Sequence, residues 1–119
     1  MFLQLNHQKL EVYNASRRFM LECYHFTKHF PIDEKYNLTS QIRRAALSVH
    51  LNIAEGASRK SPMERKRYFE VSRGSVIEID ASLDVAFDLG HFKIENCGAL
   101  PELTSGCFKM LSKLISSTV

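Results

Sequence analysis

Apolar residues recur every three or four positions along most of the sequence, the spacing of one buried face on an α-helix. The first such stretch predicts a helix from about Gln8 to Phe30, ending there because Pro31 disfavours helix at the residue before it. Its apolar row consists of Val12, Ser16, Phe19, Cys23, Phe26 and Phe30. The steps of four and three along this row predict the seam of a helical bundle.

Two further stretches predict a second and a last helix. The second begins after a cap at Asn37 or Thr39 and ends near Gly56, because glycine commonly terminates helices. The residues of its seam are Ile42, Ala45, Val49 and Asn52. The last helix starts near Leu100–Pro101, where proline fits the first helical turn, and is rich in leucine.

The third helix has the clearest start in the sequence. Ser61 can cap it, Pro62 fits its first position, and Glu64 completes a capping box. It is expected to end at Gly90. Its seam consists of Phe69, Ser72, Val76, Ile79, Leu83 and Ala86.

Four helices with short connections predict an all-α fold, an antiparallel up-down-up-down four-helix bundle that forms a single domain over residues 1–119. No segment alternates apolar and polar residues as a strand would. No apolar run is long enough to span a bilayer, and no signal peptide is evident at the start. The three cysteines, which form no CxxC motif, are expected to be reduced thiols in a cytoplasmic protein.

Net charge is only +3, so the placement of charge is more informative than its sum. Residues 43–73 hold eight basic and three acidic side chains, whereas residues 76–95 hold one lysine and five acidic side chains. The third helix is therefore basic at its start and acidic at its end, opposite to the preference of its own macrodipole. In an antiparallel bundle this predicts one cationic and one anionic end.

The predicted turn between the second and third helices supplies clustered cations that could contact phosphates. These candidate nucleic-acid-binding residues are Arg59, Lys60, Arg65, Lys66 and Arg67. Arg43 and Arg44 lie further along the second helix, nearer the other end, and suit a side face or a subunit contact. The alternative is an ordinary solvated surface that is basic for solubility.

A second candidate is a structural polar network around Asn52, which needs hydrogen-bond partners if it is buried. Glu55 or a neighbouring helix could supply them. His25 and His29 have the spacing of a metal-binding pair, but they lack a third ligand because His50 is expected beside residue 19. We therefore expect no metal site, no cofactor and no catalytic residues, and no nucleotide-binding or nucleophile motif is present.

The segments TSQIRRAALS, NIAEG and YFEVSRGSVIEIDASLDVAFDLG make the sequence resemble a known family. It is similar to the four-helix bundle proteins encoded in intervening sequences of bacterial 23S ribosomal RNA genes, and to the accessory protein of diversity-generating retroelements. The resemblance implies a ring-like homopentamer and an association with RNA or DNA. The family commonly has proline where this chain has His50, which leaves open whether the second helix is kinked there.

Two functions are compatible with these features. The first is a non-enzymatic assembly that binds nucleic acid through its basic end, and the alternative is a protein–protein scaffold without a nucleic-acid role. Apolar side chains outside the seams also predict a homo-oligomer of closed cyclic symmetry, because such patches mark interfaces. They are Tyr13, Met20, Tyr24, Phe87 and Leu89.

Overall fold

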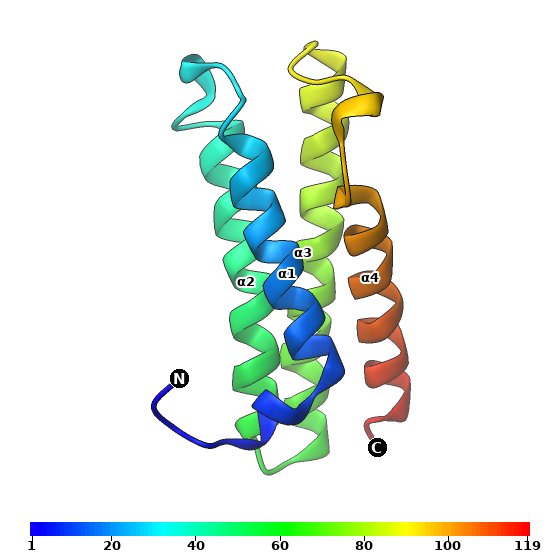
Figure 1. The fold of residues 1–119 in the computed structure, drawn as a ribbon. Helices are drawn as coiled ribbons and strands as arrows, with labels where there is room; N and C mark the ends of the chain where they lie inside the picture. The colour runs from blue at the N-terminus through cyan, green and yellow to red at the C-terminus, as the bar shows by residue number, and fades with distance from the viewer.

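The computed structural model describes residues 1–119 and is entirely helical, so the predicted all-α class is confirmed. The four long helices are α1 (Glu11–Thr27), α2 (Leu38–Ser58), α3 (Pro62–Asp88) and α4 (Leu100–Ser117). Three single turns of 3₁₀-helix precede or connect them: η1 (Asn6–Lys9), η2 (Ile32–Glu34) and η3 (Ile94–Asn96). α1 and α3 each pack against both α2 and α4, and successive helices run in opposite directions (Figure 1). α2 and α4 therefore lie diagonally across the bundle.

The start of the third helix agrees with the prediction. Ser61 Oγ accepts a hydrogen bond from the Glu64 amide at 3.3 Å, and Pro62 is the first residue of α3. The predicted capping box is only half formed, because the Glu64 side chain makes no hydrogen bond back to the Ser61 amide. α3 ends at Asp88, and Gly90 follows with φ of +77°, a left-handed conformation that favours glycine. The amide of His91 then donates to the carbonyl of Ala86 at 3.0 Å and closes the helix end.

Two predicted boundaries are wrong. The first helix starts at Glu11 rather than Gln8, because Leu10 is extended (φ −77°, ψ 130°) and separates it from η1. The same helix ends at Thr27, three residues before Phe30. The second helix agrees with its predicted end near Gly56, since α2 ends at Ser58, and it is continuous through His50.

The predicted seams form the core, in which the two seam serines are fully buried. Ser16 Oγ donates to the Tyr13 carbonyl at 2.8 Å, and Ser72 Oγ donates across the helix pair to the Val49 carbonyl at 2.6 Å. Each hydroxyl is thus satisfied, as burial requires. The largest fully buried apolar side chains are Phe19, Ile42, Ile53, Ile79, Leu111, Val49 and Val76. No helix is long and apolar enough to cross a membrane.

α2 packs closely against α3 next to the turn that joins the two helices. A Cβ added at Gly56 would lie 2.7 Å from Phe69 Cε1 and 3.0 Å from Tyr68 Cβ, so only glycine fits here without movement. Further along the pair, Ser48 Oγ and Ser75 Oγ are 2.8 Å apart. The turn that follows Gly56 is therefore anchored on a tightly packed base.

Candidate nucleic-acid interface

The turn between α2 and α3 lies at the same end of the bundle as the start of α1 and the end of α4 (Figure 1). Lys60, Lys66 and Arg67 are exposed there, and their side chains form no hydrogen bond or ion pair within the chain. Three of the five predicted phosphate-binding cations are therefore available to a ligand.

The other two cations hold the turn together. Arg59 Nη2 donates to Glu55 Oε2 at 2.9 Å and to Tyr68 Oη at 3.0 Å, and its guanidinium lies 4.9 Å from the centre of the Tyr68 ring. Arg65 Nη1 donates to the carbonyls of Arg59 (3.0 Å) and Lys60 (2.7 Å). Arg65 thus satisfies carbonyls at the end of α2, which have no partner within that helix.

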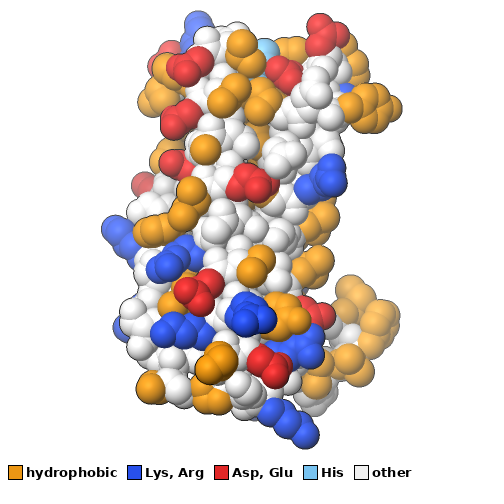
Figure 2. Space-filling view, turned by 180° about the vertical axis from the view of Figure 1, so that it is seen from behind, with side chains coloured by type: hydrophobic (Ala, Val, Ile, Leu, Met, Phe, Trp, Pro, Cys, Tyr) orange, Lys and Arg blue, Asp and Glu red, His pale blue; other side chains and the backbone are white.

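Further cations surround this end of the molecule. Figure 2 shows Lys and Arg side chains predominating in the half that contains the turn, and Asp and Glu in the other half. Lys9, Lys109 and Lys113 are exposed, as are Arg17 and Arg18 on the first half of α1, which the sequence reasoning left out. The anionic half carries Asp33, Asp84, Asp88, Glu95 and Glu102.

Arg43 and Arg44 do not join the turn. Arg43 Nε donates to Thr27 Oγ1 at 2.9 Å, and its guanidinium lies 5.1 Å from the Tyr24 ring centre, so it ties α2 to α1. Arg44 is exposed on the outside of α2.

The polar network around Asn52 does not include Glu55, the first of the two partners predicted for it. Asn52 is half-buried, and its Nδ2 donates to the carbonyl (2.9 Å) and the Oγ (3.0 Å) of Ser48. Through the contact of Ser48 with Ser75, the network reaches α3. Glu55 takes no part, because its carboxylate pairs with Arg59 one turn further along the helix.

His50 is buried in a polar contact that the sequence did not indicate. Its Nδ1 is 2.7 Å from Ser16 Oγ, and its ring stacks on Tyr13 with centroids 4.3 Å apart. His50 was expected beside residue 19, but it contacts Ser16, about one turn earlier on α1. The pKa of His50 is lowered from 6.5, first by burial and then by the positive charge of Arg17 and by His7.

The remaining candidates for metal binding or thiol chemistry are two histidines and three cysteines. His25 and His29 are exposed with ring centroids 5.9 Å apart, and no cluster of three or more potential metal ligands occurs. All three cysteines are free and buried. Burial raises the pKa of Cys23 to about 12 and that of Cys107 to about 11, so both remain protonated thiols that pack as small apolar groups.

These features define a class of protein: a four-helix bundle with a cationic end built on a tightly packed, hydrogen-bonded interhelical turn. Residues 8–113 match the family model of the 23S rRNA-intervening sequence proteins, and the chain belongs to this family.

A crystal structure at 1.70 Å of a protein of unknown function from the S23 ribosomal protein family, from Bacteroides thetaiotaomicron, is similar in fold. The TM-score is 0.80 at 18% sequence identity, and the alignment covers 89% of this chain and 96% of that one. None of the curated proteins compared with this chain is similar to it.

Proposed function

We propose that this protein is a non-enzymatic helical-bundle protein that binds the phosphate backbone of RNA or DNA through Lys60, Lys66 and Arg67. The observation that supports this most directly is that these three cations are exposed and unpaired, while Arg59 and Arg65 fix the backbone beneath them. The backbone that carries these cations is already held in place, so binding does not have to order the turn itself, which favours affinity.

Lysine and arginine contacts to phosphate position a nucleic acid without reading its bases. The ring of Tyr68, beside the turn, is already covered by the guanidinium of Arg59 on one face, so it does not offer that face for stacking on a base. The expected binding is therefore weakly dependent on sequence and strongly dependent on salt.

We further propose that the protein forms a homo-oligomer, a pentameric ring by its resemblance to the family. A ring would repeat the cationic turn along one rim, so that several weak phosphate contacts act together. The resemblance to the accessory proteins of diversity-generating retroelements also supports a nucleic-acid partner.

A titration of the triple variant Lys60→Gln, Lys66→Gln, Arg67→Gln against labelled RNA and duplex DNA tests this function. The matched control is Lys28→Gln, Lys35→Gln, Lys93→Gln, which removes three exposed cations from the opposite half of the molecule. Both variants have the same net charge, so a difference between them reports the position of the cations. We expect binding to be lost in the first variant and retained in the control.

Salt dependence gives a second measurement. For a duplex, the logarithm of the affinity should fall by about 0.9 per logarithmic unit of salt for each phosphate contact, and the turn variant should lower this slope. Wild-type protein that binds neither RNA nor DNA at low salt would exclude the proposal and favour a protein–protein scaffold. Equal losses in the two triple variants would mean that net charge, rather than the turn, determines binding.

A further inference from the structure

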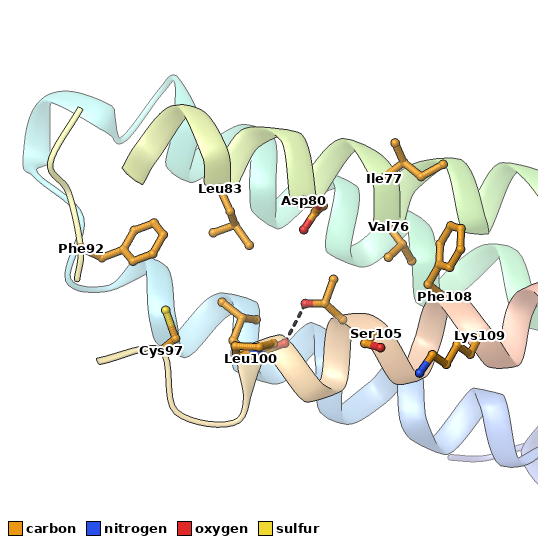
Figure 3. A pocket seen from close by; sticks show the side chains of 12 residues that line it. Val76, Ile77, Asp80, Leu83, Phe92, Cys97, Leu100, Ser105, Phe108 and Lys109 are labelled. Carbon is orange, nitrogen blue, oxygen red and sulfur yellow. Dashed lines mark hydrogen bonds between the residues drawn. The ribbon is translucent and has the colours of Figure 1, made fainter. Parts of the chain in front are cut away.

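A groove of about 550 Å³ runs between α3 and α4 (Figure 3). Its lining is mostly apolar, and Ile77 and Phe108 on its walls are 54% and 39% exposed. Asp80 is the only acidic residue of the lining; it is exposed and forms no hydrogen bond or ion pair within the chain. Lys109 is the only basic residue of the lining; it is also exposed and forms no ion pair, so the groove is an unfilled apolar surface with one acidic and one basic side chain that are not paired to each other.

The outer side of α2 has complementary features. Gln41 donates to Glu78 on α3 at 2.8 Å and Arg43 donates to Thr27 at the end of α1 at 2.9 Å, so these residues mark the two flanks of α2 that are occupied. The residues facing away from both flanks are Arg44, Leu47 and Leu51, and all three are exposed. We call these three residues the outer stripe of α2. It is an apolar ridge with an unpaired cation at one end.

We propose that the outer stripe of α2 in one copy of the protein docks into the α3–α4 groove of a second copy, with Arg44 paired to Asp80. The stripe and the groove cannot meet within one chain, because α2 and α4 lie on opposite corners of the bundle. A contact between two different surfaces is a heterologous one, the type from which cyclic rings are built.

The spacing along the two helices supports this pairing. Arg44 and Leu47 are separated by three residues, as are Asp80 and Ile77, so each pair spans about 4.5 Å of helix axis. Because α2 and α3 run in opposite directions, two copies in parallel orientation can place Arg44 on Asp80 and Leu47 on Ile77 at once. Leu51 then lies further along, toward Phe108 on the α4 wall.

Charge complementarity decides against a purely apolar partner. An uncharged ridge in this groove would desolvate Asp80 without giving it an ion-pair partner, since Lys109 in the same lining does not pair with it, and this is unfavourable. Arg44 removes that penalty and also excludes registers in which it would face apolar side chains. The same pairing relieves an exposed arginine that has no partner in its own chain.

This inference rests on the proposed homo-oligomer and names its two surfaces. The test compares Arg44→Glu, Asp80→Arg and the variant carrying both changes by sedimentation velocity at micromolar concentration. Each single change should weaken self-association at least tenfold, and the double change should restore it. Lys35→Glu, an equal charge reversal outside the contact, should leave the mass unchanged.

A second comparison tests the apolar part of the contact. Leu51 and Leu21 are both 55% exposed, on α2 and α1 respectively, so Leu51→Gln and Leu21→Gln are matched. Only Leu51→Gln should shift the protein toward the monomer, with the helical spectrum retained in both variants.

Failure of the double change to restore assembly, or equal effects of the two leucine changes, would overturn this docking mode while leaving the oligomer intact. A monomeric wild type would overturn both the docking mode and the oligomer. The phosphate-binding proposal is measured separately, by the titration of the turn variants.

Discussion

Gly56→Ala should destabilise the protein although it adds a better helix former. In a free helix interior the change would stabilise by up to about 1 kcal/mol. Here the new Cβ would lie 2.7 Å from Phe69 Cε1 and 3.0 Å from Tyr68 Cβ. Phe69 is only 3% exposed, and Tyr68 Cβ moves only with its backbone, so neither neighbour can give way easily. Overpacking of this kind costs about 1–3 kcal/mol.

The expected net effect of Gly56→Ala is therefore a loss of about 1–2 kcal/mol, given the overpacking and helix-propensity terms. Gly74→Ala is the control, because an added Cβ at this helical position meets no atom within 4 Å. It should stabilise by about 0.5–1 kcal/mol. Urea unfolding followed by circular dichroism, at one fixed protein concentration, measures both free energies of unfolding. If Gly56→Ala is as stable as Gly74→Ala, the close approach of α2 and α3 described above is wrong.

Three further substitutions test individual contacts. Because the pKa of His50 is lowered in the folded state, the unfolded chain binds the proton first, and the stability of the wild type should fall as the pH drops below about 6.5. His50→Gln should flatten this dependence when the free energy of unfolding is measured from pH 7.5 to 5. An unchanged slope would contradict the expectation. Ser16→Ala removes the partner of His50 Nδ1 and should cost about 1–3 kcal/mol, so an unchanged urea midpoint would refute a buried contact. Arg65→Met removes two hydrogen bonds to the turn and should lower the urea midpoint, whereas Arg67→Met should not, and equal effects would show that Arg65 does not brace the turn.

The fold was predictable because the local and the long-range signals agree. Ser61 and Pro62 encode a helix start that depends on adjacent residues alone, and the structure has it at the predicted residue. The start of α1 was not predictable, because the break at Leu10 depends on how η1 packs against α1 and α2. The partner of His50 was misplaced because the register between α1 and α2 depends on how the two helices pack, which the sequence alone does not fix to within one turn.

The sequence predicts five cations near one turn, but it does not indicate which of them bind within the chain and which stay unpaired. From sequence, the five cations around the turn are equivalent, since each is a basic residue near a helix end. The structure separates them by which atoms lie within reach: Arg59 meets Glu55 and Tyr68, and Arg65 meets two carbonyls. That distinction depends on the path of the turn, which only the packing around Gly56 fixes.

The same geometry revises the electrostatic reasoning about α3. Basic residues at its start oppose its macrodipole, which taken alone implies a selected function. The antiparallel turn, however, also brings these cations to the carboxyl end of α2, where positive charge is favourable, and Arg65 binds carbonyls there. The cations are unfavourable for the dipole of α3 and favourable for that of α2. Because these two effects offset each other, the dipoles do not distinguish a binding role of the cations from a structural one. The difference lies in the bonds that each side chain forms: Lys60, Lys66 and Arg67 make no side-chain hydrogen bond to a helix end and no ion pair. The proposal that they bind a ligand therefore rests on three exposed cations without a partner at one turn, rather than on charge against a dipole.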